Sequence, residues 1–404
     1  MNLLHPSARV VDAATGAILT PELIDAAAAE IAEQPIVFLP MTTTVEAVAR
    51  YLAALRLAKP VLLLDPDLDH TALIARYTTD DVHPDLALLL TTSGSTGDPK
   101  LVRLSRAAVL ANAGQVADSL GVTGEDVAIT TLPLFYSYGL SVLHSHLLRG
   151  ATVVLERTGI MQKDFWAAID EHRVTSLAFV PSQYEMLRRL RFDPARYPSV
   201  RTLTQAGGRL RTDLVTDFAA RMDAVGGRMF VMYGQTEAGP RMACLPPERL
   251  GDKLGSAGRA MPGGAFTIED DEVVYKGPNV MMGYAETAAD LSRGDDLAGV
   301  LRTGDLGHLD EDGFLFITGR LKRMAKVFGV RINLDDVERH FPVAAVAGDD
   351  KLHVFTLDGD VRALRSKIAE WLGTHFTGVD VRTISSLPLL PNGKTDYRAL
   401  EASL

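Results

Sequence analysis

The stretch Thr91-Thr92-Ser93-Gly94-Ser95-Thr96-Gly97-Asp98-Pro99-Lys100 puts hydroxyl groups, two glycines and a lysine into one turn after the apolar run 86–90. Glycines leave room for inward-pointing backbone N–H groups, the hydroxyls add donors, and the lysine adds positive charge. The spacing is not that of a P-loop. We predict a loop that binds a polyphosphate, and a flexible connector is the alternative. Its contacts would be Thr92, Ser93, Gly94, Ser95, Thr96, Gly97 and Lys100.

The composition is that of a globular chain with room for more than one core. The chain has 404 residues, of which 47% are hydrophobic, and this is enough for two or three domains. The net charge of −10 is spread out without a basic stripe, so we expect no nucleic-acid partner and no membrane contact. The single cysteine, Cys244, cannot form an internal disulfide, and no signal-like or membrane-spanning run is present. We expect a cytoplasmic protein, with Cys244 as a partly buried apolar residue and not a nucleophile.

Between residues 35 and 237, short apolar runs alternate with amphipathic stretches. This alternation is typical of βαβ units and predicts a mostly parallel sheet flanked by helices. Ligands of such sheets bind at the carboxyl ends of the strands. Residues 205–208 and 233–237 each follow a predicted strand directly. The predicted strand and helix pairs are 36–39 with 45–57, 127–132 with 140–148, 151–155 with 165–172, and 175–180 with 183–190.

The pattern changes in the last third of the chain. Gly-punctuated short runs between residues 255 and 318 predict a small β-rich subdomain, and 319–323 form a polar break. We place the main domain boundary there, with domains 1–319 and 320–404. After the break we predict two strands, a helix over Val361–Leu372 and a further strand. The predicted fold class is therefore α/β, with a large N-terminal domain of βαβ layers, the β-rich subdomain, and a small α+β C-terminal domain.

Two glycine-containing turns carry features of a nucleotide site. They are Gln205-Ala206-Gly207-Gly208 and Tyr233-Gly234-Gln235-Thr236-Glu237. Glycines after a strand let a flat base approach the backbone, and an aromatic ring supplies a stacking face. Tyr233 is therefore predicted to stack on the base.

Three further motifs occur along the chain. Leu132-Pro133-Leu134-Phe135-Tyr136-Ser137-Tyr138-Gly139 is either a gate to a pocket or a strand-to-helix turn with core aromatics. Thr303-Gly304-Asp305 would, on its own, be an ordinary turn. In Pro391-Asn392-Gly393-Lys394, the Asn-Gly pair makes a tight turn that exposes the lysine.

These motifs, in this order, resemble those of the adenylate-forming superfamily, which includes acyl-CoA synthetases, luciferases and the adenylation domains of peptide synthetases. The resemblance covers the chain from Thr91 almost to its end, and its motif style is closest to acyl-CoA synthetases and acyl-AMP ligases, in a shortened form. It implies ATP and Mg²⁺ as cofactors. An acid is adenylated with release of pyrophosphate, and the acyl group then passes to an acceptor, either the thiol of CoA or of a carrier protein, or an amine.

The resemblance also assigns roles. Thr236 would contact the α-phosphate, Glu237 would hold Mg²⁺, Lys322 would be the hinge of a mobile C-terminal domain, and Lys394 would bridge the acid and the α-phosphate. The predicted catalytic residues are Lys394, Thr236, Glu237 and Arg320. The predicted nucleotide contacts beyond the phosphate loop are Gly207, Gly208, Tyr233, Gly234, Gln235, Asp305, which would accept the ribose hydroxyls, and Arg320.

The substrate of this shortened member stays open. Tyr136 stands where amino-acid-activating relatives carry an aspartate, so a small polar or aromatic acid is favoured over an α-amino acid. Arg241 would meet a second acidic group or form a surface ion pair. The predicted pocket residues are Tyr136, Tyr138, Gln205, Gly239 and Arg241. Alternatives for the reaction are adenylation of an oxyanion such as nitrite, and a nucleotide-binding pseudo-ligase; a homodimer is also an open alternative.

Overall fold

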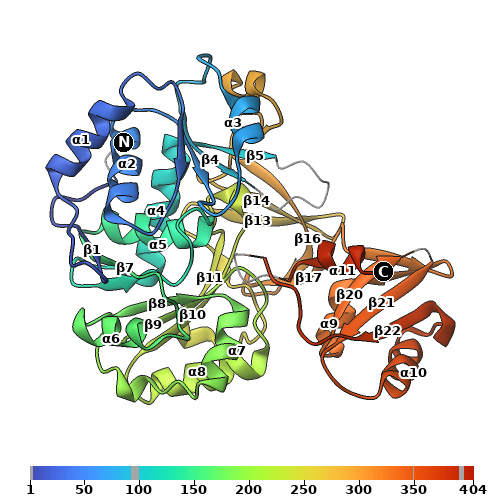
Figure 1. Ribbon diagram of the computed structural model, residues 1–404. Coiled ribbons are helices and arrows are strands. Elements are labelled where there is room, and N and C mark those ends of the chain that lie inside the picture. The colour runs from blue at the N-terminus through green and yellow to red at the C-terminus, as the bar shows by residue number, and fades with distance from the viewer. Residues whose placement is uncertain (1–2, 92–99, 349, 391–394) are drawn as a thin grey trace. The chain divides into compact units, whose positions relative to one another are not determined.

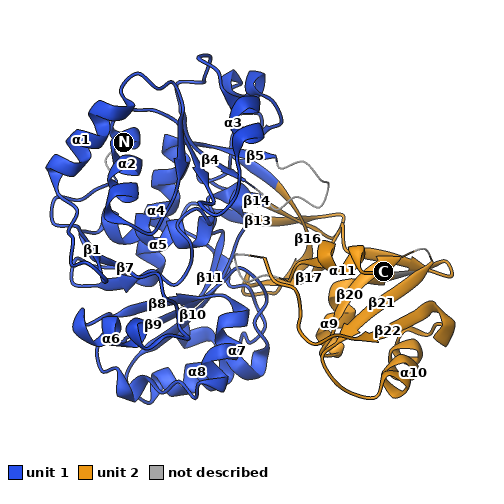
Figure 2. Cartoon of the chain, in the orientation of Figure 1, with its two compact units in different colours: residues 1–265, 275–301 blue, residues 266–274, 302–404 orange. Residues whose placement is uncertain are grey.

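The computed structural model describes residues 3–91, 100–348, 350–390 and 395–404 (Figure 1). The chain forms two compact units (Figure 2): residues 1–265 with 275–301, and residues 266–274 with 302–404. The predicted boundary at 319 and 320 stays a prediction. Several predicted site residues lie outside the described residues, namely Thr92, Ser93, Gly94, Ser95, Thr96, Gly97 and Lys394.

The first unit contains an eight-stranded sheet. Six of its strands, β1 and β6 to β10, run parallel, and the last two, β11 and β12, pair antiparallel. Its central strands are buried along most of their length, which explains the apolar runs of β7 and β8, whereas β9 also buries polar Thr202, Thr204 and Gln205. The order is β1 (Arg9–Asp12), β7 (Thr152–Leu155), β6 (Val127–Ile129), β8 (Ser176–Phe179), β9 (Thr202–Gln205), β10 (Arg228–Tyr233), β11 (Ala243–Leu245) and β12 (Arg259–Ala260).

A second, five-stranded sheet in this unit carries the ends of the phosphate-loop segment. β4 and β5 pair antiparallel, with Thr91 opposite Leu101, so the predicted loop connects two neighbouring strands of one sheet. The order is β15 (Gly283–Ala285), β5 (Leu101–Ser105), β4 (Leu86–Thr91), β3 (Val61–Leu64) and β2 (Val37–Pro40). The sequence pattern did not show that the strands divide between two sheets.

Helices accompany both sheets of the first unit (Figure 1). Several begin at side-chain caps: Thr44 accepts a hydrogen bond from the Ala47 amide, and Ser105 accepts one from the Ala108 amide. The helices are α1 (Pro21–Ile31), α2 (Val45–Arg56), α3 (Thr71–Tyr77), α4 (Arg106–Leu120), α5 (Ser137–Leu148), α6 (Lys163–Glu171), α7 (Pro181–Arg189) and α8 (Thr212–Asp223). Short 3₁₀ turns are η1 (Pro194–Arg196), η2 (Thr236–Ala238), η3 (Pro247–Arg249) and η4 (Ala288–Ser292).

The chain then forms a small β-rich region and an α+β region. A four-stranded sheet has the order β13 (Ala265–Glu269), β14 (Glu272–Lys276), β16 (Val300–Leu309) and β17 (Leu315–Arg320). The hairpin β18 (Met324–Val327) and β19 (Val330–Asn333) leads into α9 (Leu334–His340). A three-stranded sheet follows, in which β21 (Lys351–Thr356) lies between β20 (Ala344–Gly348) and β22 (Val379–Thr383). The remaining elements are α10 (Val361–Leu372), η5 (Phe376–Gly378) and α11 (Tyr397–Ala402).

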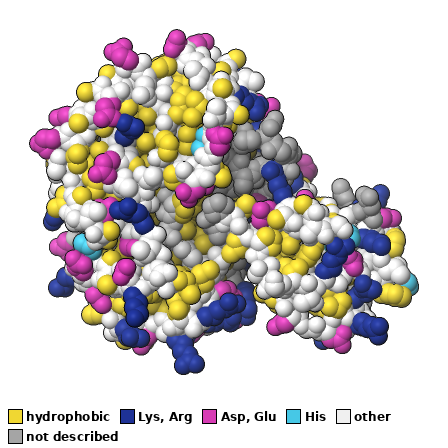
Figure 3. All heavy atoms as spheres, in the orientation of Figure 1, with side chains coloured by type: hydrophobic (Ala, Val, Ile, Leu, Met, Phe, Trp, Pro, Cys, Tyr) yellow, Lys and Arg dark blue, Asp and Glu magenta, His cyan; other side chains and the backbone are white. Residues whose placement is uncertain are grey.

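This architecture confirms the predicted fold class. The predicted helix over Val361–Leu372 is α10, and it packs its Ile368 and Ala369 into the core of the second unit. No helix within the described ranges is both long enough and apolar enough to cross a membrane. On the face shown in Figure 3, acidic and basic side chains are interspersed over the first unit, as the evenly spread charge of the sequence predicts.

Candidate active site

The predicted nucleotide turn follows the carboxyl end of β10, as expected for a parallel sheet. Tyr233 is the last residue of that strand and is partly exposed, and Thr236 and Glu237 begin the single turn η2. Gly234 has no room for a side chain, because a Cβ there would lie 1.8 Å from the Pro240 carbonyl oxygen. The turn therefore depends on glycine to fold back against residues 240 and 241.

Glu237 is held by a tyrosine from the other sheet of the first unit. The Tyr284 hydroxyl, on β15, donates a hydrogen bond of 2.8 Å to Glu237 Oε1. Burial, and then the neighbouring carboxylate, raise the pKa of Tyr284, so the phenol keeps its proton and remains a donor. The bond orients one oxygen of the predicted metal ligand.

Lys100 lies at the same place. Its ammonium group is 5.9 Å from the centroid of the Tyr284 ring and forms an ion pair with Glu286, just beyond β15. Lys100 is the predicted phosphate-loop residue that the structure describes, and it lies one residue before β5. The end of the predicted phosphate loop is thus brought next to the predicted metal ligand through Tyr284.

The donor set suits a magnesium ion that arrives with its nucleotide. Among the described residues, no group of three or more His, Cys, Asp or Glu side chains could hold a metal on its own. Mg²⁺ is usually bound through one or two carboxylates, substrate phosphates and water, so the single partly exposed Glu237 fits this role.

The turn before α5 contacts Thr236. The hydroxyls of Ser137 and Thr236 are 3.1 Å apart. Tyr136, the residue before α5, is partly exposed, and its hydroxyl lies 2.8 Å from the position that a Cβ on Gly207 would take. Burial raises the pKa of Tyr136 to about 12. The predicted gate and both glycine turns therefore lie together in the first unit.

Tyr138 and Gln205 are buried more deeply than the other predicted pocket residues. The Tyr138 hydroxyl donates to the Thr204 carbonyl at 3.1 Å, and the ring belongs to the core, as one of the two interpretations of this motif predicted. The Gln205 side-chain amide donates to the Gly208 carbonyl at 2.7 Å and so supports the glycine turn 205–208. Only part of the predicted pocket thus remains accessible in the described structure.

Arg241 is the residue for which the structure decides between two interpretations. It is only 2% exposed, so the alternative of a surface ion pair is wrong. Its guanidinium carbon lies 3.6 Å from the centroid of the Tyr138 ring. Gly239, two residues earlier, takes the left-handed conformation with φ of 66°. Cys244 is buried in β11, and burial raises its pKa to about 12, which favours the neutral thiol over the thiolate, as expected for an apolar residue.

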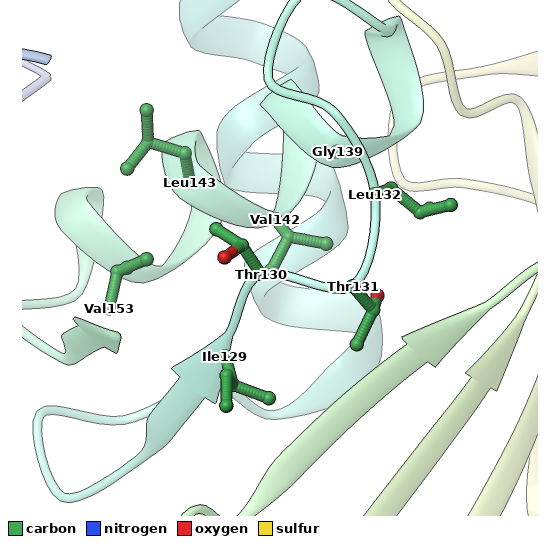
Figure 4. A pocket seen from close by; sticks show the side chains of 8 residues that line it. All are labelled: Ile129, Thr130, Thr131, Leu132, Gly139, Val142, Leu143 and Val153. Atoms are coloured by element: carbon green, nitrogen blue, oxygen red, sulfur yellow. The ribbon is translucent and has the colours of Figure 1, made fainter. Parts of the chain in front are cut away.

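A small cavity lies beside the gate motif. It is lined mostly by aliphatic side chains together with the two threonines Thr130 and Thr131, and it reaches Leu132 and Gly139 at the ends of the motif (Figure 4). Its mainly apolar lining and its small size are those of a packing defect between β6 and α5.

Asp305 and Arg320 are paired in the second unit. They are register partners on β16 and β17, with Arg320 Nε 3.3 Å from Asp305 Oδ1. Asp305 is buried, whereas the Arg320 side chain is mostly exposed. The predicted ribose ligand and the predicted nucleotide arginine therefore lie side by side.

Lys322 is exposed in the turn between β17 and β18, inside the second unit. Its neighbour Arg323 is anchored, since it donates to Asp335 at 2.6 Å and to Glu338 at 2.7 Å. Tyr397, the first residue of α11, donates to the same Glu338 at 2.8 Å. These contacts connect the turn that follows β17 to the helix that follows the predicted lysine loop.

Three supporting residues were not predicted. Tyr284 and Ser137 contact the predicted catalytic residues, and Asn279 donates from its amide to the Ala238 and Arg241 carbonyls at 2.6 and 2.8 Å. Tyr284 and Asn279 lie more than 35 positions from the turn that they support, and no local pattern marks them.

Comparison with known proteins identifies the family of this chain. Residues 71–285, more than half of the chain, match the family model described as AMP-binding enzyme. The chain belongs to this family. It is similar to an indoleacetate–CoA ligase of Aromatoleum aromaticum, with 35% identity over 275 residues that make up 64% of this chain and 52% of the relative. It is also similar to a 2-succinylbenzoate–CoA ligase of Bacillus subtilis, with 34% identity over 278 residues, 65% of this chain and 55% of the relative.

The chain thus spans about half the length of the curated relatives that it matches. Among solved structures, the o-succinylbenzoate CoA synthetase of Bacillus subtilis in complex with its acyl-adenylate intermediate superimposes with a TM-score of 0.77 at 24% identity. That match covers 97% of this chain and 94% of the solved one, and it supports the fold.

Proposed function

We propose that this protein is an AMP-forming acid–thiol ligase that adenylates a small acid with ATP and transfers the acyl group to a thiol, with CoA as the favoured acceptor. The observation that carries the proposal is the series of contacts from Lys100 through Tyr284 to Glu237. It joins the end of a polyphosphate-type loop to a carboxylate suited to magnesium, within a chain of the AMP-binding family.

The first half-reaction is a nucleotidyl transfer. A carboxylate oxygen of the acid attacks the α-phosphorus, the bond from that phosphorus to the bridging oxygen breaks, and pyrophosphate leaves. Positioning and neutralisation of charge supply most of the catalysis in such transfers. Thr236, whose hydroxyl is oriented by Ser137, would donate to the α-phosphate, and Lys394 would bridge the acid and that phosphate.

Metal and nucleotide contacts are proposed for residues of each unit. Glu237 would hold Mg²⁺, which when bound neutralises charge on the phosphates of ATP. Lys100 and the loop before it would hold the leaving pyrophosphate. Tyr233 would stack on adenine beside Gly207, Gly208, Gly234 and Gln235. In the second unit, Asp305 would accept the ribose hydroxyls and Arg320 would contact the nucleotide from the neighbouring strand.

The second half-reaction transfers the acyl group. The thiol sulfur attacks the acyl carbon of the mixed anhydride, the bond from that carbon to the phosphate oxygen breaks, and AMP leaves while the thiol proton passes to solvent. Movement of the C-terminal part about Lys322 would exchange Lys394 for a thiol-accepting surface. The relatives, named as CoA ligases, favour CoA over a carrier protein or an amine as the acceptor. A cytoplasmic location and a homodimer stay predictions.

A panel of acids tests the proposal. Each acid is incubated with ATP and Mg²⁺, and pyrophosphate release is followed with and without CoA. We expect acid-dependent pyrophosphate release, and acyl-CoA and AMP as products when CoA is present.

Glu237→Gln should raise the Mg²⁺ concentration needed for half-maximal activity, because an amide lacks the charge of the carboxylate.

Two other outcomes would redirect the proposal. Pyrophosphate release that depends on an acid but never yields a thioester with CoA would identify a carrier protein or an amine as the acceptor. Release with nitrite and with no carboxylic acid would identify the oxyanion alternative. Nucleotide binding without any pyrophosphate release would mean a pseudo-ligase and would contradict the proposal.

A further inference from the structure

Arg241 is a buried cation for which the described part of the chain provides no anion. The residue is 2% exposed, and its Nε atom is enclosed without a hydrogen-bond acceptor. No acidic side chain among the described residues forms an ion pair with it. Its one described side-chain partner is the ring of Tyr138, with 3.6 Å between the guanidinium carbon and the ring centroid.

A buried guanidinium without an anion lowers the stability of the fold unless a bound anion pairs with it. Buried charges in proteins are normally paired and hydrogen-bonded, because removing an ion from water is costly even after relaxation. A desolvated cation–π contact returns less free energy than this removal costs. The contact with Tyr138 therefore offsets only part of the cost, and the guanidinium retains donors that a planar anion would satisfy.

The backbone of Arg241 is fixed in place. Its carbonyl accepts hydrogen bonds from two buried amides, Asn112 on α4 at 2.9 Å and Asn279 at 2.8 Å. Asn279 in turn accepts a bond of 2.8 Å from the Tyr275 hydroxyl. Two segments far apart in the sequence, α4 and residues 275–279, thus hold this position rigid, which is typical of a preorganised binding residue.

The surroundings of Arg241 lead from the partly exposed gate to the interior. Tyr136 and Tyr138 meet edge to face, with 6.4 Å between the ring centroids. Tyr136 lies against Gly207, in the glycine turn 205–208. The Arg241 guanidinium lies over the ring of Tyr138. The buried thiol of Cys244 is also close enough for the positive charge of the guanidinium to lower its pKa, against the larger effect of burial.

We propose that Arg241 binds a second carboxylate of the acid substrate, so that the preferred substrates are dicarboxylic acids. This inference rests on the proposed adenylating function. One carboxylate would be adenylated beside Thr236, while the other would receive two parallel N–H bonds from the guanidinium, over the face of Tyr138. Arg241 then determines specificity, and the reacting atoms are held elsewhere.

Pairs of diacids and their monomethyl esters test the inference, since each pair has nearly the same length and differs by one charge. The panel would contain aliphatic and aromatic diacids of small size, and kcat/KM would be measured by pyrophosphate release. We expect the wild-type protein to prefer at least one diacid over its ester by about 30-fold or more, the ratio that corresponds to the loss of a buried charge pair.

Arg241→Met should reduce this ratio to near one, because methionine fills the space without charge. Arg241→Lys should give an intermediate ratio, because a lysine keeps the charge and loses the planar pair of donors. Arg228→Met is the matched control. Arg228 also lies over an aromatic ring, that of Phe230 at 5.4 Å, but it is exposed at the start of β10, so the ratio should stay unchanged.

The outcomes separate the inference from the function on which it rests. Equal wild-type activity on diacids and esters, or an unchanged ratio in a folded Arg241→Met protein, would overturn the inference alone. If Arg241→Met does not fold, the wild-type ratio and the Arg241→Lys ratio decide. Absence of pyrophosphate release with every acid would overturn the proposed function and this inference together.

Discussion

Tyr284, on β15 of the five-stranded sheet, donates a hydrogen bond of 2.8 Å to Glu237, which lies in the turn η2 just after β10 of the eight-stranded sheet. The bond fixes the carboxylate at the end of the eight-stranded sheet by a side chain of the five-stranded sheet that also carries the ends of the phosphate loop. A displacement of one sheet would therefore change the geometry of the predicted metal ligand and of Lys100 together.

Tyr284→Phe should raise the Mg²⁺ concentration for half-maximal pyrophosphate release by about 10-fold, with the maximal rate at saturating Mg²⁺ less affected. Loss of a group that orients a metal ligand typically reduces affinity by about 10–100-fold. Tyr77→Phe is the control, because the Tyr77 hydroxyl donates to the Ala285 carbonyl on the same strand at 3.0 Å and does not touch Glu237. Equal shifts in both variants would show that β15 is merely destabilised.

Lys394→Ala should abolish formation of the acyl-adenylate and leave thioester formation from supplied acyl-AMP largely intact. The lysine charge is needed while negative charge builds up around the α-phosphate, and this happens only in the first step. The two half-reactions would be measured separately, with Lys351→Ala on β21 as a control for loss of a lysine elsewhere in the same unit. Equal losses in both steps would contradict the division of labour.

Gly234→Ala should destabilise the protein severely, by about 3 kcal/mol or more, since the new methyl group would overlap the Pro240 carbonyl oxygen and the backbone would have to move. The free energy of unfolding would be obtained from denaturant titration. Gly114→Ala is the matched control. Gly114 lies within α4 with no heavy atom near its Cβ position, so alanine there should stabilise by about 0.5–1 kcal/mol. Similar effects of both changes would contradict the described turn.

His144 should make folding sensitive to acid. It is buried on α5, 2.7 Å from the Tyr51 hydroxyl on α2, and burial lowers its pKa to about 3. The unfolded chain has the ordinary pKa of about 6.5, so it takes up the proton first as the pH falls. Stability is therefore complete above pH 6.5 and falls by about 1.4 kcal/mol per pH unit toward pH 3.

His144→Gln keeps a polar partner for Tyr51 and does not titrate. Its free energy of unfolding should fall less steeply between pH 6.5 and pH 4 than that of the wild type, although buried His146, with a lowered pKa, contributes in the same direction. His5→Gln at the exposed start of the chain is the control. Identical slopes in the wild type and His144→Gln would show that the buried pair is not the source.

The sequence allowed the local elements of this structure to be predicted. It did not predict the pairing and packing of residues that lie far apart in the chain. The turns at Gly207 and Gly234 were predicted because glycine after an apolar run is a local signal. The helix α4 was not predicted, since it buries polar Asn112 and Gln115 together with alanine and valine and so shows little periodicity. β1 was missed because its four residues form a strand only by pairing with β7, 143 positions further on.

The same limit applies to the candidate site. The residue type of Lys100 predicted a phosphate contact, whereas the roles of Glu237 and Asp305 were predicted from the family resemblance. The structure brings Lys100 next to Glu237 through a tyrosine that no local pattern marks. Arg241 shows the reverse case. Its residue type favours a surface position, and only its tertiary contacts with Tyr138, Asn112 and Asn279 reveal that it is buried.

The return of residues 275–301 to the first unit, after the excursion of residues 266–274 into the second, limits how this chain can be cut or recombined. A chain shortened to residue 265 would lose β15, leaving the edge of β5 unpaired, and it would also lose Asn279 and Tyr284. A junction at residue 265 should therefore yield an insoluble product, and a junction after residue 301 would cut strand β16 and separate most of it from its sheet neighbour β14. No single cut therefore separates the two compact units, because the second unit contains residues on both sides of 275–301.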